Sequence, residues 1–321
     1  MSLLEVKDLK KYYPAGGGLF KPQKFVKAVD GVSFTLEKGE TLGLVGESGC
    51  GKSTLARALL RLEEPQSGSI FLDGVDLCAL KGEKLRRKRG EFQMIFQDPY
   101  ASLNPRRSIR ATLEEPLLLH TDLDASGRKE RIGELLDMVG LHREHADRYP
   151  HQFSGGQRQR IGIARALAVN PKFIVADEPV SALDVSVQAQ IVNLLQEIQK
   201  KTETAFLFIA HDLAVVEHIS KRIMVMYLGK VMEAGNAEEL CTRPLHPYTE
   251  GLLASVPVLD PAKRGKKKSL TGDVPSPLSP PQGCRFHPRC PYAEKICMEK
   301  APEMREISNG HFCCCHFAGK V

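Results

Sequence analysis

The feature that most restricts the fold is a glycine-rich loop placed between an apolar run and a helix-like segment. Residues 46–53 have the sequence GESGCGKS, which fits the pattern G-x-x-x-x-G-K-S/T. The apolar run 41–45 before the loop predicts a buried strand, and residues 54–62, rich in Ala, Leu and Arg, predict a helix. Strand, loop and helix in this order form a phosphate-binding loop, because backbone N–H groups and the helix N-terminus attract anions. We therefore expect an α/β fold that binds a nucleotide.

The positions of this loop have distinct expected roles. Lys52 is expected to reach the β- and γ-phosphates of the nucleotide, and Ser53 to bind Mg²⁺. Cys50 lies inside the loop, where we expect its thiol to pack passively and a bulky adduct on it to crowd the β-phosphate. The expected nucleotide contacts of the loop are Gly46, Glu47, Ser48, Gly49, Cys50, Gly51, Lys52, Ser53 and Thr54.

A second apolar run, at residues 173–176, ends in two adjacent carboxylates, Asp177 and Glu178. The run predicts another buried strand. At its end Asp177 is expected to bind Mg²⁺ through water, and Glu178 to polarise the water that attacks the γ-phosphate. The loop and the carboxylates together predict a nucleotide hydrolase, although phosphate-binding loops also occur in some kinases and in small GTPases.

The remaining apolar patterns indicate a mixed sheet. The run 205–210 lacks alternation, as expected for a strand buried on both faces of a parallel sheet. Two pairs of segments do alternate, 4–6 with 32–36 and 223–227 with 231–233, and they indicate an antiparallel portion. Apolar residues at helical spacing predict an amphipathic helix over 186–200.

Composition changes along the chain and predicts three segments, and it also excludes several classes of protein. We expect one domain over residues 1–255, a linker over 256–283 with a basic run and several prolines, and a loop-rich, cysteine-containing extension over 284–321. With 42% apolar and 26% charged residues, the chain is not a disordered one. No apolar run approaches the ~20 residues of a membrane span, and no secretion signal is recognisable. The net charge of +6 is mild and does not call for nucleic acid.

Residues 153–160, which begin a helix-like segment, resemble the signature loop of ATP-binding-cassette (ABC) ATPases. The order of the other motifs resembles that family too. Gln97 matches the Q-loop, residues 181–184 match the D-loop, and His211 matches the switch histidine. Tyr13, with Tyr12 as its rival, matches the aromatic residue that stacks on adenine. The resemblance implies an ABC-type nucleotide hydrolase with a mixed-sheet core, an antiparallel β edge and a helical subdomain at about residues 98–165.

The resemblance also implies how the site works. ATP is expected on Tyr13, the loop, Gln97 and Asp177, with Mg²⁺ held by Ser53, Gln97 and Asp177. Catalysis is expected from Lys52, from Glu178, which orients water, from Gln97, and from His211, which contacts the γ-phosphate. The signature residues serve the nucleotide held by a partner subunit rather than the chain's own, and they are Ser154, Gly155, Gly156 and Gln157.

Four further segments narrow the resemblance to importers of dipeptides and oligopeptides, with the F-type ATP-binding subunits of dipeptide permeases the most similar. These segments are 97–106, 148–152, 245–249 and 272–278. The family pattern implies a second homologous ATPase subunit, two membrane permeases, an indirect partnership with a solute-binding protein, and a location at the cytoplasmic face of the inner membrane. Nickel and haem are alternative cargoes, and a soluble ABC ATPase without a transport role is an alternative class.

Six of the nine cysteines follow residue 283. Cys284, Cys290 and Cys297, with one of the adjacent Cys313, Cys314 and Cys315, can form a four-thiolate site for zinc or an iron–sulfur cluster. Their spacing exceeds the about two to four residues common between zinc ligands, which favours the cluster. The resemblance implies a 4Fe–4S cluster with Cys315 as the fourth ligand. Zinc, or thiols that bind nothing, are the alternatives. Cys78 and Cys241 are expected to be ordinary packed or surface residues.

Overall fold

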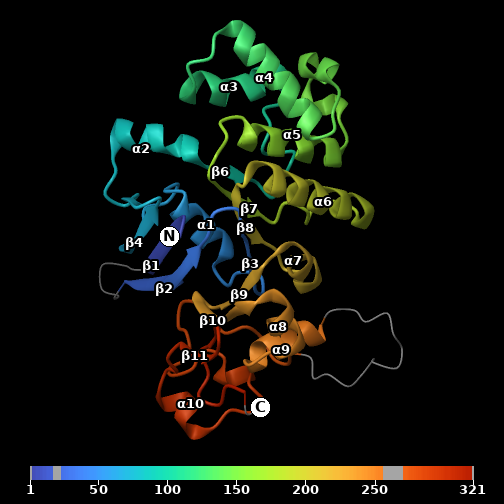
Figure 1. Ribbon diagram of the computed structural model, residues 1–321. Coiled ribbons are helices and arrows are strands. Elements are labelled where there is room, and N and C mark those ends of the chain that lie inside the picture. The colour runs from blue at the N-terminus through green and yellow to red at the C-terminus, as the bar shows by residue number, and fades with distance from the viewer. Residues whose placement is uncertain (1, 17–22, 256–269, 320–321) are drawn as a thin grey trace. The chain divides into compact units, whose positions relative to one another are not determined.

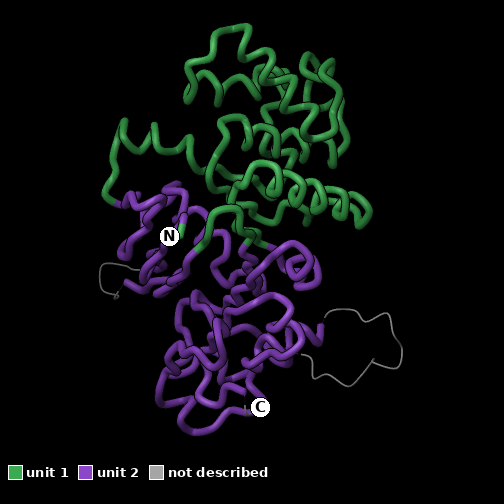
Figure 2. Tube along the Cα trace, in the orientation of Figure 1, with its two compact units in different colours: residues 1–2, 36–41, 79–209 green, residues 3–35, 42–78, 210–321 purple. Residues whose placement is uncertain are grey.

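The computed structural model describes residues 2–16, 23–255 and 270–319 (Figure 1). The chain forms two compact units (Figure 2). Unit 1 comprises residues 1–2, 36–41 and 79–209, and unit 2 comprises residues 3–35, 42–78 and 210–321. The basic run 264–268 and the first half of the expected linker, 256–269, lie outside the described residues.

Unit 1 contains three parallel strands whose side chains are mostly buried, in the order β6-β7-β8. The strands are β6 (Phe92–Ile95), β7 (Phe173–Asp177) and β8 (Ala205–Ile209). Every residue of β7 and β8 is buried, which confirms the predicted strands without alternation. The helices of this unit are α2 (Gly82–Lys88), α3 (Ile109–His120), α4 (Ala125–Met138), α5 (Gly155–Leu167) and α6 (Val185–Thr202), with 3₁₀ turns at Arg89–Glu91, Arg143–Asp147 and Pro150–Gln152.

Unit 2 contains two groups of strands. In the first, β3 (Thr41–Val45) pairs in parallel with β9 (Arg222–Tyr227), and β9 pairs with β10 (Lys230–Asn236) in the predicted antiparallel sense. The second is a sheet in the order β2-β1-β4-β5, made of β2 (Lys24–Leu36), β1 (Leu4–Ala15), β4 (Ser67–Leu72) and β5 (Val75–Asp76). Its helices before residue 256 are α1 (Lys52–Leu59), α7 (Leu213–Ile219), α8 (Ala237–Thr242) and α9 (Pro247–Ala254).

The extension has more regular structure than its sequence predicts. Besides a 3₁₀ turn at His287–Arg289 and helix α10 (Lys295–Glu299), it contains β11 (Arg305–Ser308) and β12 (His311–Cys313). β12 pairs with β10 on the side opposite β9, and β11 pairs with β12, so the extension adds two strands beyond β10. The sequence did not indicate these two short strands, and most of the rest of the extension is loop. The edge of β10 is covered rather than left with unpaired backbone groups.

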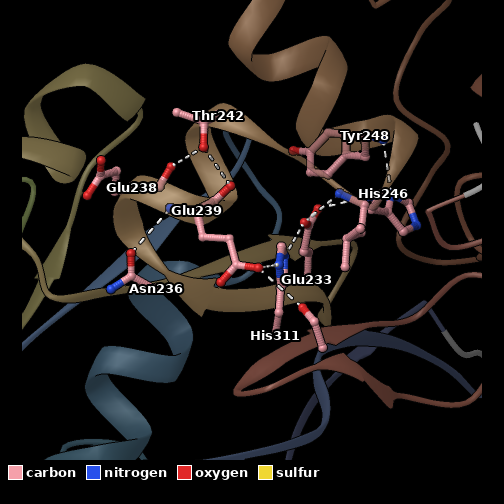
Figure 3. A network of polar contacts seen from close by, with 10 residues as sticks. Glu233, Asn236, Glu238, Glu239, Thr242, His246, Tyr248 and His311 are labelled. Carbon is pink, nitrogen blue, oxygen red and sulfur yellow. Dashed lines mark hydrogen bonds and ion pairs between the residues drawn. The ribbon is translucent and has the colours of Figure 1, made fainter.

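A buried carboxylate, Glu233 of β10, joins the extension to this edge (Figure 3). Its oxygens accept hydrogen bonds from the backbone N–H groups of Leu245 and His246, at 2.8 and 3.0 Å, and from Nε2 of His311, at 2.8 Å. Glu239 of α8 lies 3.5 Å from the other ring nitrogen of His311. One carboxylate thus fixes β12 and the turn before α9 to the same strand.

One helix boundary differs from the sequence prediction. The helix after the glycine-rich loop covers Lys52–Leu59 rather than residues 54–62. Helix α5 begins at Gly155, within the segment 153–160 that was expected to begin a helix. In the described part of the chain, no helix combines the length and the apolar character that crossing a membrane requires.

Candidate nucleotide-binding site

The phosphate loop in unit 2 has a backbone that only glycine can adopt at two positions. Gly46 (φ 157°) and Gly51 (φ 110°) both have positive φ. A Cβ atom at Gly46 would lie 2.2 Å from the carbonyl oxygen of Met226, and one at Gly51 would lie 2.0 Å from that of Ala28. Both clashes are with backbone, which cannot yield as a flexible side chain does. The loop is therefore held tightly between β9 and β2.

Lys52 is the first residue of α1, and its side chain bonds back to the start of the loop. The residue is 5% exposed. Its ammonium group donates to the carbonyl oxygens of Gly46 and Glu47 at 2.7 and 3.2 Å. Gly51, the N-cap, offers no side-chain cap, and the first turn contains no acidic residue. The N–H groups at this helix start face no competing carboxylate from their own turn, which suits an anionic phosphate. Ser53 and Thr54 lie in the same turn.

Cys50 is buried inside the loop, with 3% of its surface exposed. Its sulfur lies 4.0 Å from Nζ of Lys52, and burial raises the pKa of the thiol. At neutral pH the group is therefore a protonated, packed thiol, as the sequence analysis expected.

Unit 2 also contains the candidate adenine and switch residues. The hydroxyl of Tyr13 donates to Glu63, and the ammonium of Lys11 lies 5.2 Å from its ring centre. Its rival Tyr12 donates to Asp30 on β2. His211 is exposed and follows Ala210, whose N–H donates to the carbonyl of Leu44 in β3. His211 therefore lies at the end of β3 from which the phosphate loop starts.

The candidate catalytic carboxylate lies in unit 1, at the end of β7. Asp177 is buried, with 4% exposed, and Glu178 has a left-handed backbone at φ 47°. A non-glycine residue with this φ is uncommon, and such strain concentrates at functional sites. The N–H of Glu178 donates to the carbonyl of Ile209 at 3.0 Å, and Nε2 of Gln97 donates to its carboxylate at 2.9 Å. The structure thus brings together Gln97 and Glu178, which are far apart in the sequence.

The signature segment of unit 1 forms the N-terminus of α5. Ser154 caps the helix: its hydroxyl accepts from N–H of Gln157 at 3.3 Å, and the Gln157 side chain accepts from N–H of Ser154 at 3.0 Å. A Cβ atom at Gly156 would lie 2.6 Å from Cγ1 of Val187 on α6. Gly155 and Gly156 leave the start of this helix free of Cβ atoms, so that a phosphate could approach its N–H groups.

Four cysteines of the extension line one small cavity in unit 2: Cys284, Cys290, Cys297 and Cys315. His246 and Phe286 also line it. Burial raises the pKa of Cys284 to about 12, and the neighbouring cysteines act in the same direction. Within the described residues, however, no three histidine, cysteine or acidic side chains are arranged to hold a single metal ion. Cys313 and Cys314 are buried and do not line the cavity.

Two contacts of Glu47 in the phosphate loop are not predicted by the sequence. Its N–H donates to the hydroxyl oxygen of Tyr248 on α9, and its carboxylate pairs with the guanidinium of Arg289 in the extension. Residues 245–249, which include Tyr248, resemble a family motif. This motif is the available signal in the sequence, but it does not indicate which distant residue Tyr248 contacts.

Two family descriptions match the chain. Residues 29–181 match the ABC transporter family, and residues 232–297 match the oligopeptide/dipeptide transporter C-terminal region. The second match covers the segment that includes Tyr248 and Arg289.

Close relatives match almost over their full length. The chain is 56% identical to the oligopeptide transport ATP-binding protein AppF of Bacillus subtilis, over 98% of this chain and 97% of the relative. It is 48% identical to the dipeptide transport ATP-binding protein DppF of Escherichia coli, over 97% and 93%. Among solved structures, the dimeric ATP-binding cassette MJ0796 in a post-hydrolysis state with ADP and Pi has a TM-score of 0.65 at 29% identity, over 73% of this chain and 98% of that one.

Proposed function

The chain belongs to the ABC transporter family of oligopeptide and dipeptide transport ATP-binding proteins, and from this premise we propose that it powers import of short peptides by hydrolysing ATP. The observation that carries the proposal is the joint match of a cassette and of the peptide-transporter C-terminal region in one chain. A cassette alone would not distinguish peptide transport from other ABC functions.

The residues of the phosphate loop bind the nucleotide in this proposal. Lys52 exchanges its contacts with the Gly46 and Glu47 carbonyls for the β- and γ-phosphate oxygens, and the N–H groups of the loop and of α1 bind the remaining phosphate oxygens. Tyr13 stacks on the adenine. A preorganised loop backbone reduces the ordering cost of binding.

Hydrolysis needs a base beside the attacking water, and Glu178 takes this role. Its carboxylate accepts the proton as the water oxygen bonds to the γ-phosphorus and ADP leaves. Gln97, which already donates to this carboxylate, holds its orientation. His211 donates to the γ-phosphate, where negative charge develops.

The oxygen-bearing side chains of Ser53, Gln97 and Asp177 are of the kinds that Mg²⁺ prefers. We assign them as its ligands, with Asp177 acting through water. Bound Mg²⁺ neutralises phosphate charge during transfer. Asp177 is the last residue of β7 and directly precedes Glu178, so the assignment places a metal ligand next to the proposed base.

The signature residues Ser154, Gly155, Gly156 and Gln157 serve a nucleotide on a second, homologous ATPase subunit. ATP then binds a closed pair of subunits better than an open one, and this difference in affinity drives the permeases between states. The further partners are two permeases and, indirectly, a solute-binding protein, at the cytoplasmic face of the membrane. The cargo is a dipeptide or an oligopeptide, with nickel and haem as alternatives.

For the cysteines we propose a 4Fe–4S cluster on Cys284, Cys290, Cys297 and Cys315, all of which line one cavity. Around a single zinc ion the four sulfurs would stand about 4 Å apart, given Zn–S distances of about 2.3 Å. A four-iron cluster carries each thiolate on a different iron, so its sulfurs stand further apart. The spacing of these cysteines along the chain, wider than the about two to four residues common between zinc ligands, favours the cluster over zinc.

The test is anaerobic purification of the chain with the proteins that accompany it in the membrane fraction. We expect Mg²⁺-dependent ATPase activity, co-purifying permeases and a second cassette, and iron with visible absorption. Cys290→Ser should lose the iron, whereas Cys78→Ser, a cysteine outside the cavity, should keep it. ATPase activity without any membrane partner would favour the soluble alternative, and stoichiometric zinc without iron would overturn the cluster.

A further inference from the structure

An arginine of the C-terminal extension reaches the phosphate loop. Both terminal nitrogens of Arg289 contact the carboxylate of Glu47, Nη1 at 2.6 Å and Nη2 at 3.0 Å. This bidentate geometry makes the pair one of the strong, charge-assisted hydrogen-bonded contacts between side chains. Glu47 directly follows Gly46, and its carbonyl oxygen is one of the two that hold Lys52. The pair therefore acts on the part of the loop that positions the phosphate-binding lysine.

The pair is sheltered from water. The Arg289 side chain is 5% exposed and that of Glu47 26%. The guanidinium carbon lies 5.8 Å from the ring centre of Tyr227 and 5.9 Å from that of Phe286, and Nε donates to the carbonyl of Thr271 at 3.3 Å. Packing fixes the arginine, so little side-chain entropy remains to be lost when it holds Glu47.

A second contact fixes the backbone at the same residue. The hydroxyl oxygen of Tyr248 accepts from N–H of Glu47 at 2.9 Å. Tyr248 is fully buried, and its ring packs against Tyr227 and Phe286, with ring centres 4.7 and 5.4 Å away. The same aromatic group thus supports both residues that hold Glu47. Neither contact would be needed merely to close the loop, since Lys52 and the glycines already do so.

We propose that Arg289 and Tyr248 are positioning residues for the phosphate loop: through Glu47 they hold it in the conformation that binds the ATP phosphates. This inference rests on the proposed function, because it assumes that the phosphate loop binds ATP. It assigns a role to two residues that lie outside the cassette motifs. It makes the extension a working part of the nucleotide site. Neither residue touches the nucleotide, and the effect passes entirely through Glu47.

The test measures MgATP affinity of the full chain by isothermal titration calorimetry, with thermal unfolding recorded in parallel. Arg289→Gln and Tyr248→Phe should each weaken MgATP binding roughly tenfold, the change expected from losing one strong hydrogen-bonded contact. Arg289→Lys, which keeps the charge but not the two-pronged geometry, should give an intermediate loss. The matched control is Arg305→Gln, because Arg305 also lies in the extension but donates only to the Cys315 carbonyl among the contacts described. It should leave the affinity unchanged.

A double-mutant cycle separates positioning from general destabilisation. If Arg289 acts through Glu47, then Glu47→Gln combined with Arg289→Gln should bind MgATP no more weakly than the weaker-binding single variant. Effects on affinity that simply add, or that follow the unfolding temperature in every variant including Arg305→Gln, would overturn the proposal. Absence of MgATP binding in the unaltered chain would instead refute the proposed function, so the two failures are distinguishable.

Discussion

Replacing His311 with leucine should destabilise the extension, because it removes one partner of the buried Glu233. The carboxylate has no exposed surface and accepts hydrogen bonds from two backbone N–H groups and from His311. Breaking a buried ion pair costs about 3–5 kcal/mol, and the two remaining donors place the cost near the lower end, at about 3 kcal/mol. For a unit of this size that corresponds to a fall of roughly 6–12 °C in the transition temperature.

The stabilisation by the His311–Glu233 pair should depend on pH, in a direction that the pKa of His311 determines. Hydrogen bonding to Glu233 raises the pKa of His311 above 6.5 in the folded chain. The charged pair therefore stabilises the fold fully below about pH 6.5, and its contribution is lost as the pH rises through the raised pKa. The difference in transition temperature between the natural chain and His311→Leu should be largest near pH 6 and smaller near pH 9.

Differential scanning calorimetry at several pH values measures both effects. His151→Leu is the matched control, since His151 is exposed, and it should change the transition little at any pH. A His311→Leu variant whose transition temperature equals that of the natural chain at pH 6 would refute the reasoning. So would a difference between the two that grows as the pH rises.

Three further predictions concern the nucleotide site. Glu178→Gln should keep its affinity for MgATP while hydrolysis falls at least about 100-fold, and unchanged turnover would remove Glu178 as the base. Gly156→Ala should slow turnover by up to about 100-fold, because the added Cβ would lie 2.6 Å from Val187 and displace the start of α5. ATP binding to the same chain should not weaken. A loss of that binding would contradict the role of Gly156 toward a partner's nucleotide. Alkylation of Cys50 should be slow, because the thiol is buried with a raised pKa, and should abolish ATP binding once mass spectrometry shows it complete; a modified chain that still binds ATP would contradict this.

The local motifs were predictable because short-range rules determine them. The loop at 46–53 needs glycines where φ is positive, and buried parallel strands need continuous apolar runs, so both are visible in the sequence. The pairing of β9 with β10 followed from alternation. These features depend on residues within a few positions of one another.

Contacts over long sequence distances were not predictable in this way. No periodicity indicates that Arg289 would pair with Glu47, which is 242 residues away, or that β12 would pair with β10. The left-handed backbone of Glu178 is likewise set by its surroundings rather than by its residue type. Such features arise from the packing of the whole unit, and a single sequence carries little trace of them.

The most direct test of the central claim is peptide uptake into liposomes that contain the chain with its co-purified permeases, second cassette and solute-binding protein. We predict that labelled dipeptides or oligopeptides accumulate only when MgATP is supplied on the side of the cassettes, and that Glu178→Gln abolishes the accumulation. Uptake of nickel or haem but not of peptide would contradict the proposed cargo. Peptide uptake that continues unchanged with Glu178→Gln would contradict the claim that this chain powers transport.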